Sequence, residues 1–138
     1  MIQTKINDCK IIALDEYKNF SAKICVYENS KKTIPFEAKR VFYLYDIPSG
    51  QSRGAHAHKE CMQLLISVSG SFNVFVDDGI NSKTFFLNKP NTGLFIPEGI
   101  WASELDFSAG SVCLVLASHF FDEKDYLRDY NVFLKYKS

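Results

Sequence analysis

The chain is organised around the stretch Arg53-Gly54-Ala55-His56-Ala57-His58-Lys59, which holds two of its three histidines. Side chains alternate between faces in an extended segment, so His56 and His58 share one face and Ala57 lies on the other. Gly54 permits a bend just before the pair, and a cation flanks the pair on each side. A same-face histidine pair of this kind can bind a metal, move protons or support a core.

The sequence around this stretch predicts an all-β protein. Segments rich in β-branched and aromatic residues are separated by turn signals about every ten residues, a spacing typical of a β-sandwich or barrel. We expect strands at residues 9–14, 21–27, 40–47, 62–68, 72–76, 83–87, 94–96 and 111–117. We expect turns at residues 15–20 and 88–93, and a hairpin turn at Asp77-Asp78-Gly79.

The C-terminal tail departs from this pattern. Asp122 is a predicted helix N-cap, and the acidic residues that follow it, among them Asp125, suit the first turn of a helix. Tyr126, Tyr130 and Phe133 then recur at helical spacing. The sequence therefore predicts one short C-terminal helix that packs on the sheet and keeps its charged residues on a solvated face.

Length and composition limit the class of protein. A chain of 138 residues can bury a real core as one domain, which we place over residues 1–138. The net charge is zero, so no nucleic-acid or anionic membrane surface is expected. No apolar run is long enough to span a bilayer and residues 1–8 lack a signal core, so we expect a cytoplasmic protein. The four cysteines form no Cys-x-x-Cys pair and are expected to be free thiols.

Two spacings resemble the sequence motifs of cupins, which are small jelly-roll barrels. Gly50-x5-His56-x-His58, closed by Gly70, resembles the first motif, in which two His and one Glu bind a metal. Here the Glu position falls on Gln63, and in the second motif, Pro-x-Gly-x-x-His, Ala102 replaces the final His. A catalytic metal site usually has three good protein ligands. We therefore expect a cupin-type jelly roll, a β-sandwich or barrel, that uses neither a metal nor another cofactor.

Without a metal, the histidine pair suits proton transfer, because imidazole titrates near neutral pH. Moving a proton on carbon requires an adjacent carbonyl and a group that stabilises the enolate. Gln63, a tyrosine hydroxyl or Arg53 can supply that stabilisation. Arg40, Arg53 and Lys59 are candidate ligands of a diphosphate, and Trp101 or a tyrosine can stack on a sugar or a base.

Longer segments resemble one family more closely, the nucleotide-sugar 3,4-ketoisomerases that act on dTDP-4-keto-6-deoxyglucose. The likeness begins near residue 34 and rests on residues 39–43, 53–59, 77–79, 93–97 with Trp101, 107–118 and 122–130. The Arg-Gly-x-His-Ala-His-Lys run combined with the Asp-Tyr-x-Arg-x-Tyr tail is the most specific part of the match. The first segment adds Tyr43 to the candidate substrate contacts.

This resemblance implies a metal-free isomerisation through an enediol, in which the C3 proton is removed and reprotonation at C4 leaves the ketone at C3. It implies that His58 is the base on carbon and that His56 moves protons between the oxygens or orients the substrate, with the reverse assignment open. It also implies a homodimer with exchanged N-terminal strands, which fits residues 10–14. The product would feed an aminotransferase that makes a 3-amino-3,6-dideoxyhexose for a surface glycan.

Three other functions stay open from the sequence. A 3,5-epimerase acting on the same substrate class would also exchange protons beside the ketone, although no His–Asp pair is evident near the motif. A metal-binding cupin, such as a dioxygenase or a sensor, would use the histidine pair as ligands. A nucleotide-sugar binding module would bind the same ligand without turnover.

Overall fold

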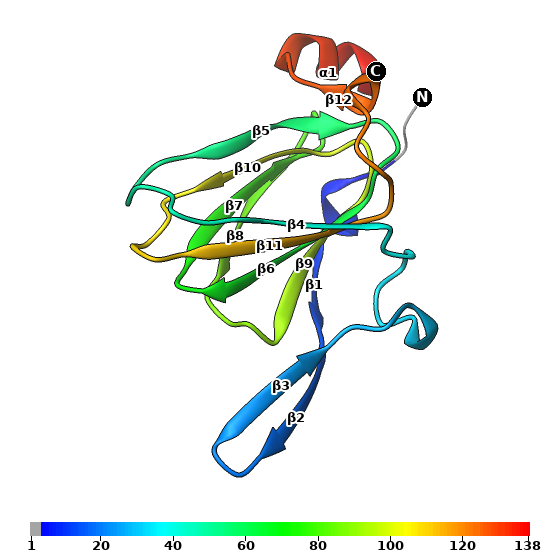
Figure 1. The fold of residues 1–138 in the computed structure, drawn as a ribbon. Helices are drawn as coiled ribbons and strands as arrows, with labels where there is room; N and C mark the ends of the chain where they lie inside the picture. Colours follow the sequence, from blue (N-terminus) through cyan, green and yellow to red (C-terminus); the bar gives the residue numbers. More distant parts are fainter. Residues whose placement is uncertain (1–3) are drawn as a thin grey trace.

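In the computed structural model, residues 4–138 form two five-stranded antiparallel sheets that enclose a common core, together with a separate two-stranded hairpin (Figure 1). The strand orders are β1-β9-β6-β11-β4 and β12-β5-β10-β7-β8, and β2 pairs with β3. The elements are β1 (Lys10–Ala13), β2 (Asp15–Asn19), β3 (Ala22–Val26), β4 (Arg40–Leu44), β5 (Arg53–His58), β6 (Gln63–Ser69), β7 (Phe72–Asp77), β8 (Ser82–Leu87), β9 (Thr92–Ile96), β10 (Trp101–Leu105), β11 (Val112–Ala117), β12 (Tyr126–Leu127) and α1 (Tyr130–Lys137). The prediction of an all-β jelly roll with one short C-terminal helix is confirmed.

The core lies between the two large sheets and follows the period-two pattern of their strands. In β7, Phe72, Val74 and Val76 are fully buried, while the residues between them are partly exposed. In β11, Cys113 and Val115 face them from the other sheet. Burying a side chain of this kind stabilises the fold by about 1.5–3 kcal/mol, so each alternating strand holds its register strongly.

The structure has a strand, β10, that the sequence did not predict. Of its five residues only Trp101 and Leu105 are large and apolar, so the segment lacks a recognisable alternation. Its inward positions are occupied by Ala102 and Glu104, which line a cavity instead of filling a core. The predicted strand at residues 40–47 is also shorter than expected, because Asp46 takes a left-handed backbone conformation just after β4.

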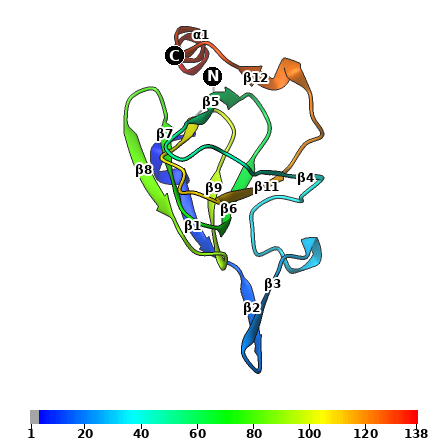
Figure 2. The same ribbon diagram turned by 60° about the vertical axis from the view of Figure 1, so that its left-hand side comes forward.

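The predicted turn at residues 15–20 is wrong, because Asp15–Asn19 is strand β2. It pairs with β3 from Asp15 opposite Val26 to Asn19 opposite Ala22, and the chain reverses at Phe20, whose φ is +55°. The hairpin stands off from the two large sheets, at the end opposite α1 (Figures 1 and 2). Polar residues are therefore compatible with a strand here, since both faces of β2 are largely exposed.

The predicted start of the C-terminal helix is also wrong. The Asp122 side chain caps a single 3-10 turn by accepting a hydrogen bond from the Lys124 backbone amide. The chain then forms β12, and α1 begins only at Tyr130, where Asp129 caps it through the Val132 amide. α1 has eight residues, and none of the helices within residues 4–138 has the length and apolar character that crossing a membrane requires.

Candidate active site

A cavity of about 190 Å³ lies inside the barrel between the two large sheets. One wall is apolar and comes from the sheet of β4, β6, β9 and β11, with the side chains Phe42, Leu44, Leu65, Ile96 and Val115. The opposite wall comes from β5 and β10 and carries polar groups, namely Arg53, His56, His58 and Glu104. A ligand with one apolar and one polar face therefore fits the division between the two walls.

The alternation of β5 directs the histidine pair into this cavity, as the sequence predicted. His56 and His58 both line it, and their ring centroids are 4.9 Å apart. Ala57 points to the other face, is fully buried and packs with Leu127 and Phe133. A larger residue between the histidines would push the tail off the sheet, so the small side chain at position 57 lets β12 lie against β5.

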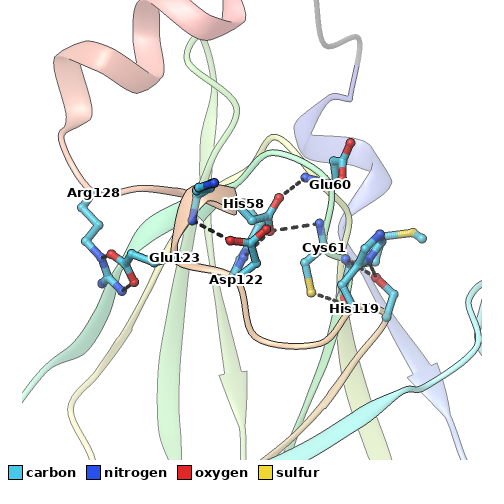
Figure 3. Close-up of polar contacts among 11 residues, drawn as sticks. His58, Glu60, Cys61, His119, Asp122, Glu123 and Arg128 are labelled. Atoms are coloured by element: carbon cyan, nitrogen blue, oxygen red, sulfur yellow. Dashed lines mark hydrogen bonds and ion pairs between the residues drawn. The ribbon is translucent and has the colours of Figure 1, made fainter.

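His58 forms a hydrogen-bonded pair with Asp125, with Nδ1 of the imidazole 2.9 Å from Oδ2 of the carboxylate. Two backbone amides hold the same carboxylate: Glu60 N donates to Oδ1 at 2.7 Å and Cys61 N donates to Oδ2 at 3.3 Å. Figure 3 shows His58, Glu60 and Cys61 close together, with dashed lines that mark hydrogen bonds among the residues drawn. No His–Asp pair was evident near the motif in the sequence, and the fold supplies one from residue 125. Asp125 is an orienting partner of His58 and not a solvated helix residue.

This contact determines which nitrogen of His58 is available for chemistry. Because Asp125 accepts a hydrogen bond from Nδ1, the proton of the neutral ring sits there and Nε2 keeps its lone pair. Nε2 is buried and has no hydrogen-bond partner within residues 4–138. Burial lowers the pKa of His58 below its ordinary value, and the bond from Asp125 opposes that shift. His58 is therefore poised as a neutral proton acceptor in the cavity.

His56 is also neutral at pH 7. Burial lowers its pKa to about 4, a proton on His58 would lower it further, and the charge of Arg128 acts in the same direction. Two adjacent imidazoles that both stay uncharged form a site that accepts a proton without a repelling charge beside it. The pair therefore suits removal and return of a proton near neutral pH.

The ring of Tyr126 packs against both histidines. The sequence analysis placed Tyr126 in a helix and therefore did not predict this contact. It lies in β12 opposite His58, and its ring centroid is 4.4 Å from that of His58 and 4.9 Å from that of His56. Arg128 stacks over the outer face of Tyr126 at 4.4 Å and pairs with Glu123 at 2.7 Å. The tail thus closes one end of the cavity with an aromatic ring that is itself held from outside.

Three of the predicted substrate contacts lie at or beside the cavity. Arg53 and Gln63 line it, from β5 and β6 respectively. Arg40 lies at the start of β4 with its guanidinium 5.1 Å from the ring of Phe42 and 5.8 Å from that of Phe121. Its Nε is buried without a hydrogen-bond partner within residues 4–138, so this cation has a donor free for an anion.

The other three predicted contacts do not line the cavity. Tyr43 is 57% exposed and points outward, because the inward positions of β4 belong to its neighbours. Trp101 packs on α1, with its ring 5.3 Å from Tyr130 and 5.7 Å from Phe133. Lys59 follows β5, and its backbone amide donates to the carbonyl of Asp125. None of these three residues is among those that line the cavity.

The residues in the cavity do not fit the metal site of a typical cupin. Ala102 lies directly opposite His56 across the β5–β10 pair, so a methyl group occupies the place of the third histidine. Gln63 offers a neutral amide, which is a weak ligand. His58 uses its Nδ1 on Asp125. This leaves two imidazoles and one amide where three strong ligands are usual.

A second group of possible ligands consists of His58, Cys61 and Asp125, whose donor atoms lie within 4.8 Å of one another. These atoms already have partners. Both carboxylate oxygens of Asp125 accept hydrogen bonds, and the Cys61 thiol is directed to the carbonyl of Met62 at 3.5 Å. The cluster is therefore an assembled hydrogen-bond network around His58 rather than a vacant ligand set.

Comparison with known proteins agrees with the chemistry of this cavity. A sequence model of the family described as FdtA: WxcM-like, C-terminal, matches residues 7–138. The TDP-4-oxo-6-deoxy-alpha-D-glucose-3,4-oxoisomerase of Aneurinibacillus thermoaerophilus is 42% identical over 113 residues, which is 82% of this chain and 80% of the relative.

Solved structures point to the same enzymes. A 3,4-ketoisomerase from Helicobacter canadensis is 45% identical, has a TM-score of 0.89 and covers 94% of this chain and 97% of its own. A mutant of QdtA, the 3,4-ketoisomerase of Thermoanaerobacterium thermosaccharolyticum, in complex with TDP-4-keto-6-deoxyglucose, is 32% identical, with a TM-score of 0.91 and 96% coverage of each chain. These relatives favour a ketoisomerase over the epimerase and metal-cupin alternatives. The chain belongs to the FdtA family (WxcM-like, C-terminal) and is a sugar 3,4-ketoisomerase.

Proposed function

We propose that the chain converts TDP-4-keto-6-deoxyglucose into its 3-keto isomer, with His58 as the base that acts on carbon. The observation that carries this proposal is the state of His58: Nδ1 is bound to Asp125, and Nε2 is buried in the cavity without a partner among residues 4–138. The substrate is supported by the 42% identical relative, which is named for a TDP-4-oxo-6-deoxyglucose oxoisomerase.

In this mechanism the ketone at C4 acidifies the hydrogen at C3. Nε2 of His58 takes that proton, and the bonding electrons form the C3–C4 double bond of an enediol. Return of a proton to C4 leaves the carbonyl at C3, so the reaction is an internal redox exchange with no external oxidant. One base serves both carbons, because they are adjacent and the histidine keeps the proton between the two steps.

Asp125 prepares His58 for both halves of the reaction. Before transfer it holds the tautomer that leaves Nε2 free, and after transfer its negative charge stabilises the imidazolium. The two backbone amides that bind Asp125 keep the carboxylate in place. The site is thereby set in its reactive geometry before the substrate arrives.

The exchange also requires proton movement between the oxygens on C3 and C4. His56 lies beside His58 in the cavity and stays neutral at pH 7, so it can give and take such a proton. Gln63 and the hydroxyl of Tyr126 provide neutral polar contacts for the developing enediol. We assign His56 to the oxygens and His58 to the carbons because, within residues 4–138, a carboxylate orients His58 and none is bonded to His56.

Substrate binding is proposed to divide between sugar and diphosphate. The apolar wall suits the C6 methyl group of a 6-deoxy sugar. The candidate diphosphate ligands are Arg53 at the cavity and Arg40, whose buried Nε has no partner in the described part of the chain. Guanidinium groups bind phosphate oxygens in a bidentate way. The 3-keto product is a substrate for amine transfer at C3, which fits the biosynthesis of a 3-amino-3,6-dideoxyhexose.

A homodimer with exchanged N-terminal elements is part of the proposal. The predicted exchange segment, residues 10–14, instead holds β1, which pairs with β9 of the same chain. The hairpin of β2 and β3 is the element without a place in either large sheet, and its Phe20 is 95% exposed. Strand β4 is an edge strand. Pairing of the hairpin with a partner's β4 would cover the exposed hairpin and the free edge of β4.

The test is incubation of the purified protein with TDP-4-keto-6-deoxyglucose in D2O, followed by NMR. The carbonyl signal is expected to move from C4 to C3, with deuterium entering at these carbons. His58→Asn is expected to lower turnover by orders of magnitude, and an untouched C4 ketone in the wild-type reaction would refute the function. A product that keeps its C4 ketone but exchanges protons at C3 and C5 would indicate the epimerase instead.

A further inference from the structure

A buried carboxylic acid, Glu104, lies in the cavity and has no part in the mechanism above. Glu104 occupies an inward position of β10, two residues from Ala102, and is 8% exposed. Its pairing with β5 is irregular: Ala102 opposes His56, whereas Glu104 opposes Arg53, so β5 carries a bulge at Gly54, whose φ is +76°. The bulge opens room for the Glu104 side chain within the sheet pair.

Gly54 and Glu104 are fitted to each other. A Cβ atom at position 54 would overlap Oε2 of Glu104, so the carboxyl group occupies the space that any other residue at position 54 would fill. The left-handed backbone of Gly54 also favours glycine. Position 54 of β5, next to the histidines, therefore has no side chain, and the carboxyl group of Glu104 fills the space that one would occupy.

The carboxyl group of Glu104 has few partners. Within residues 4–138 it forms no ion pair, and the hydrogen bond that acts on it comes from its own backbone amide. Arg53, its neighbour across the strands, is exposed and does not pair with it. A carboxyl group has two oxygens, so a single amide leaves part of its hydrogen-bonding capacity unused. Buried polar groups normally use that capacity, so the remaining capacity of Glu104 inside this cavity indicates a ligand contact.

The surroundings of Glu104 favour its neutral form. Burial raises its pKa to about 7, and the contact with its own backbone amide offsets only part of that rise. The titratable or charged groups around it are Arg53 and His56 on β5 and Cys113 on β11, and burial also raises the pKa of that thiol. From β7 its neighbour is Val74, which carries no charge.

We propose that Glu104 is a substrate-binding residue that, as the protonated acid, donates a hydrogen bond to an oxygen of the bound sugar. This inference rests on the proposed ketoisomerase function and adds a polar contact on the wall that carries His56. The acid offers one O–H donor and one acceptor, a combination that matches a sugar hydroxyl or keto oxygen. A carboxylate at the same place would lack the donor and would repel an anionic nucleotide sugar.

The experiment compares Glu104→Gln, Glu104→Leu and the exposed control Glu37→Gln, with kcat and KM measured between pH 6 and 9. Wild type is expected to lose affinity above pH 7, as Glu104 ionises. Glu104→Gln keeps a neutral donor and acceptor, so it is expected to retain wild-type KM at pH 6.5 and to lose this pH dependence. Glu104→Leu is expected to raise KM about tenfold with a smaller change in kcat. Glu37→Gln is expected to behave as wild type.

Two results would overturn the inference. One is a folded Glu104→Leu protein with the KM and pH profile of wild type. The other is a Glu104→Gln protein that keeps the rise of KM above pH 7. If the leucine variant does not fold, the glutamine profile alone decides. Wild-type turnover in the D2O assay tests the proposed function separately, so a failure of Glu104 as a contact is distinct from a failure of the reaction.

Discussion

Replacing Asp125 by Asn removes the negative charge beside His58 while keeping the shape of the side chain. The charge lies next to Nδ1, at 2.9 Å from the nearest carboxylate oxygen. Coulomb's law with an effective dielectric constant of about 20 gives about 4 kcal/mol for two charges about 4 Å apart. In the proposed mechanism that energy stabilises the imidazolium formed when His58 takes the C3 proton, so its loss is expected to lower kcat by about 10²–10³-fold.

The orientation of the new amide does not rescue the reaction. If its oxygen stays on His58, the NH2 group faces the Glu60 amide, and one backbone hydrogen bond is lost. If the NH2 group faces His58, it forces the proton of the imidazole to Nε2 and blocks the base. In both cases the charge is absent, and the folded state is expected to lose about 1–3 kcal/mol.

The assay is the NMR-monitored ketone transfer, with pH profiles of kcat for wild type, Asp125→Asn and the control Asp122→Asn. Asp122 lies in the same segment and caps the 3-10 turn without touching His58. Because Asp125 holds the pKa of His58 up, its removal is also expected to shift the acidic limb of the profile to lower pH. A folded Asp125→Asn protein that turns over within threefold of wild type would refute the assigned role.

Further predictions concern the other buried groups. Burial lowers the pKa of His58, so wild-type turnover is expected to persist as the pH falls to 6.5 and to decline only below it, as the base becomes protonated; a profile that falls already above pH 7 on the acidic side would contradict this. The pKa of Glu104 is raised from 4.5 to about 7, so the native state binds this proton more tightly than the unfolded chain. The contribution of Glu104 to the free energy of unfolding is greatest below pH 4.5, and about 3 kcal/mol of it is lost between pH 4.5 and 7. Urea titrations are expected to show this fall in wild type and not in Glu104→Gln. Gly54→Ala is expected to destabilise the protein by about 1–3 kcal/mol and to raise KM, since the new Cβ displaces Glu104; unchanged thermal unfolding would argue against the bulge geometry.

The strands that sequence reasoning located are those with strong apolar alternation. β7 and β11 were predicted because their buried residues follow a period of two or form a continuous apolar run. Strands β2 and β10 were not predicted from the sequence, for opposite reasons. β2 is largely exposed on both faces, and β10 directs Ala102 and Glu104 into a cavity. Neither strand buries a row of large apolar side chains, which is the signal that a sequence pattern carries.

The C-terminal tail shows the limit of local spacing. Residues 122–133 have the capping residue and the aromatic spacing of a helix, and the part from Tyr130 onward does form one. The segment before it forms strand β12 instead, because Tyr126 and Leu127 pair with His58 and Ala57 of β5. Pairing with an edge strand and burial of Leu127 outweigh the weak helical preference of so short a segment.

The sequence by itself determined the face and the character of the histidine pair. Alternation along one strand is a local property, so His56 and His58 had to point the same way, and the substitutions at Gln63 and Ala102 ruled against a full metal-ligand set without any coordinates. Tertiary structure alone decided which groups surround the pair. Asp125 reaches His58 across 67 residues, and Glu104 reaches the cavity through a bulge in a neighbouring strand. Both contacts depend on sheet register, and the pKa values that make the site reactive depend on burial, which no run of adjacent residues encodes.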